Sequence, residues 1–77
     1  MSALLFLTRD HCMLCAEALP VVQARARRRG HAVTVVDVDS DQALSDRFGD
    51  RVPVVLVDGE EVLSGRFTSA DVRRALR

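Results

Sequence analysis

Apolar residues occur in four short runs that polar or turn-forming residues separate. The first run, residues 3–7, is continuously apolar and favours a strand that is covered on both faces. Residues 32–38 are rich in β-branched valine and indicate a second strand, and residues 54–57 indicate a third. Asp58-Gly59 is a strong signal for a two-residue hairpin, so a fourth, antiparallel strand is expected over residues 60–63.

Three other segments have helical patterns. In residues 13–29 the buried stripe of the predicted helix consists of Cys15, Leu19, Val22 and Ala26. Candidate N-caps are Asp39, Ser40 or Asp41 for a short middle helix and Thr68 or Ser69 for the last helix. A strand, a helix and a second strand form a right-handed crossover with parallel strands. The predicted order is therefore βαβαββα, an α/β fold with a four-stranded mixed sheet and helices on both faces.

The chain has 77 residues, which predicts one domain spanning residues 1–77. Eleven basic residues balance eleven acidic residues, so we expect no nucleic-acid partner and no membrane partner. The apolar run at residues 3–7 is too short for a signal-peptide core, so a cytoplasmic location is expected. A monomer is expected, because no large apolar stripe is left after the core is assigned.

Both cysteines lie where the first predicted strand ends and the first predicted helix begins. A C-x-x-C in this context indicates redox chemistry. A helix that begins at or just after Cys12 places its sulfur beside unpaired N–H groups of the first turn. Such sites lower the cysteine pKa from about 8.5 by one to several units. We therefore predict that Cys12 is the nucleophile and that Cys15, one turn on and more enclosed, is the resolving thiol.

Two other functions are compatible with the cysteine pair. Cys12 and Cys15 are able to supply half of a four-thiolate metal or iron–sulfur site across a dimer. A metal site within a single chain is excluded, because His31 is expected at the end of the sheet opposite Cys12. No bound metal is expected. A non-enzymatic binding module is the second alternative.

His11 directly precedes Cys12 and would favour its thiolate if protonated, or it simply faces solvent.

Four features together carry a family resemblance. They are Cys12-Met13-Leu14-Cys15 after the first strand, Pro20 within the helix, Val52-Pro53 before the third strand, and Gly65 after the fourth. With them the chain resembles glutaredoxin-like proteins of the thioredoxin-fold superfamily. The resemblance implies a thiol–disulfide oxidoreductase with no bound cofactor, and a cis peptide bond before Pro53 beside the cysteines. The alternative is that Pro53 begins the third strand in the trans form.

The resemblance also implies a substrate surface. The backbone of Val52 beside Pro53 would bind an extended disulfide-bearing protein or a small thiol, in the manner of an added strand. Arg9 matches a position that is often basic and would meet one carboxylate of glutathione, and Gly65 and Thr68 would lie near the other.

Departures from the family pattern weaken the case for glutathione as co-substrate. Met13 and Leu14 replace the usual proline and aromatic residue, and Gly65-Arg66 replaces a Gly-Gly pair. The electron donor, glutathione or a reductase, therefore stays open. The identity of the general base also stays open, since none of the titratable residues nearest the cysteines, Asp10, His11 and Glu17, is assigned this role by the sequence.

Overall fold

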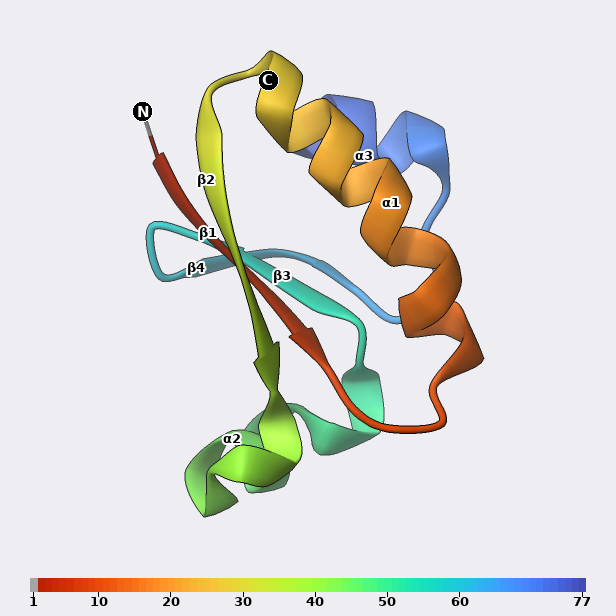
Figure 1. Cartoon of the computed structure of the whole chain (residues 1–77), viewed down its shortest axis with the longest axis vertical. Coiled ribbons are helices and arrows are strands. Elements are labelled where there is room, and N and C mark those ends of the chain that lie inside the picture. The colour runs from red at the N-terminus through yellow and green to blue at the C-terminus, as the bar shows by residue number, and fades with distance from the viewer. Residues whose placement is uncertain (1) are drawn as a thin grey trace.

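A computed structural model describes residues 2–77 (Figure 1). Its strands are β1 (Ser2–Thr8), β2 (His31–Asp37), β3 (Val54–Val57) and β4 (Glu60–Ser64). Its α-helices are α1 (Met13–Arg28), α2 (Gln42–Phe48) and α3 (Ser69–Ala75), and the short 3₁₀ turns η1 (Val38–Ser40) and η2 (Gly49–Arg51) flank α2. The predicted βαβαββα order is confirmed. No helix within these residues is long and apolar enough to cross a membrane.

The four strands form one mixed sheet in the order β2-β1-β3-β4. β1 is parallel to β2 and antiparallel to β3, and β3 is antiparallel to β4. The inner position of β1 explains its unbroken apolar sequence, because both faces of an inner strand are covered. Leu4, Phe6 and Leu7 are all fully buried.

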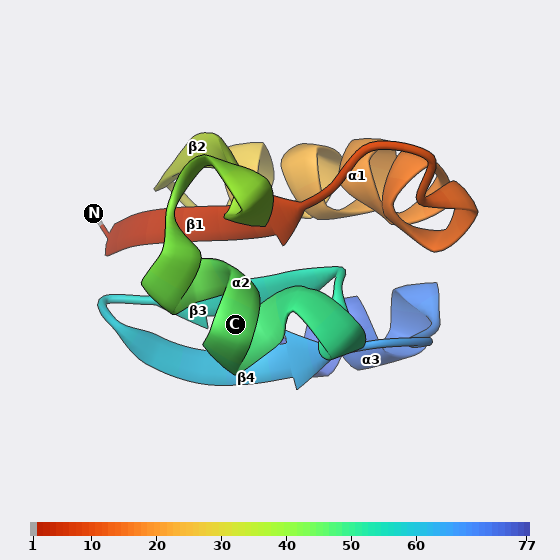
Figure 2. The ribbon, with the colours of Figure 1, turned by 90° about the horizontal axis from the view of Figure 1, so that it is seen from below.

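The helices cover both faces of the sheet, as predicted. Figures 1 and 2 show α1 and α3 on one side of the strands and α2 apart from them. Leu4 and Phe6 pack with Val22 of α1 and Val72 of α3 in one core cluster. A smaller cluster on the α2 side consists of Leu7, Val38, Phe48 and Val54. Because side chains alternate along a strand, β1 supplies residues to both clusters.

The hairpin and the helix N-caps that the sequence predicted are present in the structure. Asp58 and Gly59 have φ angles of 50° and 85°, as a type I′ hairpin requires. Asp41 caps α2 through its side chain, and Thr68 caps α3. Asp39 and Ser40, the other candidates for the α2 cap, lie in η1 instead.

β2 is less buried than its valine-rich sequence suggested. Val35, one of the valines of this predicted strand, has 45% of its surface exposed. Val38 is buried but lies beyond the strand, in η1. The reason is topological, because β2 is an edge strand and, among residues 2–77, only β1 pairs with it.

We predict that Thr68→Ala lowers the free energy of unfolding by about 1 kcal/mol, since it removes an N-cap. Thr68 Oγ1 accepts a hydrogen bond from the Asp71 N–H at 3.1 Å, and Asp71 Oδ2 accepts one from the Thr68 N–H at 2.9 Å. Urea unfolding measures the change, and Ser69→Ala, on the exposed first residue of α3, is the matched control. Equal stability of the two variants would contradict the assignment of this cap.

Candidate functional site

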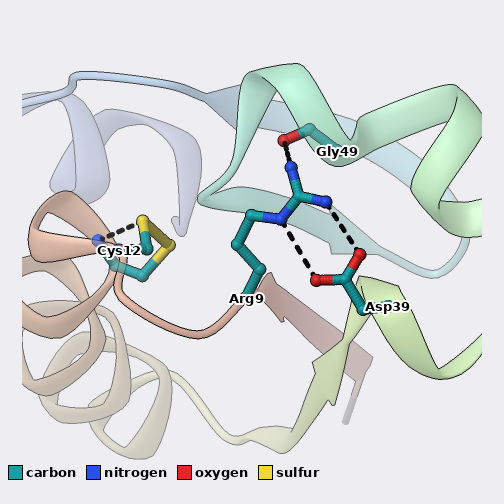
Figure 3. Close-up of a disulfide and its surroundings, with 5 residues drawn as sticks. Arg9, Cys12, Asp39 and Gly49 are labelled. Carbon is teal, nitrogen blue, oxygen red and sulfur yellow. Dashed lines mark hydrogen bonds and ion pairs between the residues drawn. A yellow bond between two sulfur atoms is a disulfide. The ribbon is translucent and has the colours of Figure 1, made fainter.

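Cys12 and Cys15 form a disulfide at the N-terminus of α1, with their Cα atoms 5.2 Å apart (Figure 3). Cys12 is the N-cap residue and has extended backbone geometry. Its Sγ accepts a hydrogen bond from the Cys15 N–H at 3.1 Å. The helix therefore begins immediately after Cys12, as predicted, and one of its free N–H groups points at this sulfur.

The two cysteines differ in burial. Cys15 is only 3% exposed and belongs to the core cluster with Leu4 and Phe6. Cys12 is half-buried at the margin of that cluster. An incoming reactant therefore meets Cys12 first, whereas Cys15 is reached through Cys12.

The residues before and between the cysteines line the open side of the disulfide. His11 is exposed and has a φ angle of 60°, a left-handed conformation that is uncommon outside glycine. Together with Arg9, Cys12 and Met13 it lines a shallow hollow of about 480 Å³. That a protonated His11 favours the thiolate form of Cys12 stays a prediction.

Met13 was not identified from the sequence as a surface residue beside the cysteines. It is 74% exposed, although it directly follows the more accessible cysteine. The signal was present in the sequence, since Met13 falls outside the buried helical stripe that contains Cys15. It gives the rim of the disulfide an apolar, adaptable side chain.

The peptide bond between Val52 and Pro53 is cis, as the resemblance implied, and the trans alternative is wrong. Leu7 pairs with Val54, so Pro53 lies at the end of the sheet where β1 leads into the cysteine loop. The Gly65 N–H donates to the carbonyls of Arg51 and Pro53, both at 2.9 Å. The segments that contain the cysteines, Pro53 and Gly65 therefore meet at one end of the sheet.

Arg9 is engaged within the protein. Its Nη2 and Nε donate to the Asp39 carboxylate at 2.7 and 3.2 Å, and its Nη1 donates to the Gly49 carbonyl at 2.8 Å (Figure 3). The hydrogen bond and charge of Arg9 lower the pKa of Asp39. These bonds tie the end of β1 to η1 and to the end of α2. The predicted contact of Arg9 with a substrate carboxylate stays a prediction, and it would compete with this network.

Gly65 and Thr68 line a second hollow, of about 110 Å³, between α1 and the segment that leads into α3. Leu14 and Ala18 form its α1 side. The Thr68 N–H already donates to the Asp71 carboxylate, and the hydrogen bonds from Thr68 lower the pKa of Asp71. An external carboxylate at Thr68 would therefore displace an internal one, so this part of the predicted substrate surface also stays a prediction.

His31 lies opposite Ser2, at the end of the sheet away from the cysteines, as expected. Within residues 2–77 no group of three or more His, Cys, Asp or Glu side chains is placed to hold a metal ion.

The family model that describes the Glutaredoxin-like domain (DUF836) matches residues 3–77. The chain belongs to the glutaredoxin-like domain family. Its C-x-x-C motif is Cys12-Cys15, and its fold is that of the thioredoxins. Among curated proteins, no relative matches the chain.

Three solved structures place this glutaredoxin-like domain among its relatives. A structural genomics target protein from X. campestris is 36% identical, with a TM-score of 0.76 over 92% of this chain and 91% of that one. A thioredoxin mutant from Halobacterium salinarum is 31% identical, with a TM-score of 0.73 over 97% of this chain and 71% of the thioredoxin. A protein from Nitrosomonas europaea shares the fold at 22% identity, with a TM-score of 0.79 over 99% and 92% of the two chains.

We predict that Arg9→Gln raises the pKa of Asp39 toward its ordinary value of 3.8. A depressed native pKa adds stability above the unfolded value, and this stability is lost as the pH falls through the native pKa. The stability difference between wild type and Arg9→Gln should therefore be largest above pH 3.8 and should shrink below it.

Carboxyl NMR titration of Asp39 and urea unfolding at several pH values test this prediction. Arg27→Gln, on an exposed part of α1, is the control and should leave the pKa of Asp39 unchanged. An equal stability loss at every pH would show that Arg9 acts only through its hydrogen bond to Gly49.

Proposed function

We propose that this glutaredoxin-like domain reduces or exchanges disulfides, with Cys12 as the attacking thiol and Cys15 as the resolving thiol. The observation that carries the proposal is the unequal burial of two bonded cysteines at a helix N-terminus. A structural staple has no need for one accessible sulfur, whereas a two-step exchange does.

In the first step the Cys12 thiolate attacks one sulfur of a substrate disulfide. The substrate S–S bond breaks, a mixed disulfide forms on Cys12, and the released substrate thiolate takes a proton from solvent. The Cys15 N–H that donates to Cys12 Sγ stabilises the attacking thiolate. The partial positive charge of the α1 N-terminus acts in the same direction.

In the second step the Cys15 thiolate attacks Cys12 Sγ. The mixed disulfide breaks, the Cys12–Cys15 disulfide forms, and the second half of the substrate leaves as a thiolate, which takes up a proton from solvent in place of the one that Cys15 released on ionising. Two electrons have then passed from the domain to the substrate. A thiol or dithiol donor returns the domain to its reduced form by the reverse exchange. Because Cys15 is already positioned to bond Cys12, this step needs little rearrangement.

We propose an extended, disulfide-bearing protein segment as the preferred substrate. The exposed Met13 side chain offers an apolar contact beside Cys12, and the half-buried Val52 precedes the Pro53 turn at the same end of the sheet. A peptide that lies along Val52 would gain backbone hydrogen bonds in the manner of an added strand. Glutathione would use Arg9 and Thr68, and both already have internal partners.

We predict that Cys15→Ser accumulates a mixed disulfide on Cys12 when the reduced protein meets a disulfide substrate, because the second step is removed. Intact-mass spectrometry should show one adduct per chain, released by excess reductant. Cys12→Ser is the matched variant and should form little adduct, since Cys15 is buried. Equal adduct on the two variants would contradict the assignment of roles.

We also predict that the rate at which glutathione reduces the oxidised domain rises linearly with glutathione concentration through the millimolar range. Linear dependence is expected of a donor that reacts without a binding site, because Arg9 and Thr68 are engaged. Stopped-flow or quenched mass measurements provide the rates, and a dithiol reductant provides the comparison. Saturation of the rate would show that glutathione binds before it reacts, and would make it the proposed donor.

A further inference from the structure

The two edge strands of the sheet differ in their protection against pairing with another strand. β4 has five residues, begins with Glu60 and Glu61, and has a register shift against β3. Short length, charges and irregularities are the usual means of blocking an edge. β2 has seven residues, no charge or proline between His31 and Asp37, and an unbroken register with β1. By these criteria the β4 edge is blocked and the β2 edge is open.

The open edge is also apolar. Val35 is 45% exposed, and Ala32 and Thr34 are exposed beside it. Only β1 pairs with β2, so the peptide groups on its outer side have no strand partner within the described residues. An unpaired, uncharged and regular edge is a template for another strand.

The sequence of β2 is complementary to itself in the antiparallel direction. If two copies pair with Thr34 opposite Thr34, then Val33 lies opposite Val35 and Ala32 lies opposite Val36. His31 and Asp37, at the two ends, then also lie opposite each other. We propose that β2 pairs with β2 of a second copy about a two-fold axis at Thr34, which makes one sheet continuous across both chains.

The faces of the sheet agree with this register. Val33 and Val35 pair with Leu4 and Phe6, so they lie on the α1 side of the sheet. In the dimer these valines from both copies meet on that side and cover Val35. Val36 packs with the α2-side cluster, and Ala32, four positions away, shares its face. Every apolar residue of the strand therefore meets an apolar residue on its own face.

The two ends of β2, His31 and Asp37, are also chemically complementary. His31 Nδ1 and Nε2 are both buried without a hydrogen-bond partner in the described chain. Asp37 Oδ1 accepts from the Asp39 N–H at 2.9 Å, which leaves Oδ2 to accept another bond. Directly opposed residues have Cβ atoms about 4.5–5.5 Å apart, within reach of an imidazole N–H and a carboxylate. These ring atoms have no solvent access in the single chain, so the bond to Asp37 requires the His31 ring to turn toward the edge, and the symmetric dimer would then form it twice.

A second copy fits this edge better than a foreign peptide. Any extended peptide satisfies the main-chain groups, but the edge also favours apolar residues opposite Val33 and Val35 and a donor opposite Asp37. A second copy carries both at the correct spacing. Since a strand edge of this length buries a small area, below roughly 1,200 Å², the dimer should be weak. The expectation of a monomer assumed that the core covers the apolar residues, whereas Val35 is left exposed.

Cross-linking tests the register. In a Cys12→Ser/Cys15→Ser background, Thr34→Cys places two thiols directly opposite each other at the two-fold axis. Disulfide dimers should form at least about ten-fold faster than in two control variants, because pairing raises the local thiol concentration. Ala32→Cys lies on the same strand but opposite Val36, and Glu61→Cys lies on the β4 edge. Equal rates in all three variants would overturn the proposal.

Sedimentation equilibrium of the unmodified, oxidised domain tests the dimer itself. The average mass should rise from 8.5 kDa toward twice that value as the concentration approaches the millimolar range. Thr34→Lys places like charges opposite each other and should keep the mass at 8.5 kDa, whereas Glu61→Lys should associate like the wild type. A constant wild-type mass, equal association of Thr34→Lys, or an edge that binds only added peptides would each overturn the proposal.

Discussion

Burial of β1 on both faces is the constraint on which the rest of the structure depends. The strand lies between a parallel and an antiparallel neighbour and contributes to two separate clusters, through Leu4 and Phe6 on one side and Leu7 on the other. Because neighbouring strands and both clusters hold β1 in place, the position of its C-terminal end is fixed as well. The cysteine loop begins there, and Cys15 packs in the same cluster as Leu4 and Phe6, so the position of the disulfide follows from the packing of β1.

The chemistry at the end of β1 arises from a simple asymmetry. The first turn of α1 leaves N–H groups without helical partners, and one of them reaches Cys12 Sγ. The 3.6-residue helical repeat turns Cys15 toward the core while Cys12 stays at the rim. In the proposed exchange, one helix start would therefore supply both the stabilised thiolate and the protected resolving thiol.

Features that depend on neighbouring residues were predictable from the sequence. The Asp58-Gly59 hairpin, the Thr68 cap and the start of α1 follow from local backbone chemistry. The cis bond at Pro53 needed the family resemblance, because most bonds before proline are trans. The role of Arg9 was not accessible, because Asp39 and Gly49 are 30 and 40 residues away. The exposure of Val35 depends on strand order, which a valine-rich pattern alone does not reveal.

The division of the core by the sheet has a consequence for how the domain opens. The α2-side cluster is the smaller of the two, and in the described part of the chain it shares no buried side chain with the cluster that contains Cys15. Local unfolding of α2 is therefore able to leave the cysteine helix in place. Arg9 spans this boundary, since it follows β1 and binds both η1 and the residue after α2. Detachment of α2 with Gly49 would remove one of the three hydrogen bonds of Arg9 and leave the two to Asp39, so it would loosen but not free the guanidinium that lines the hollow beside Cys12.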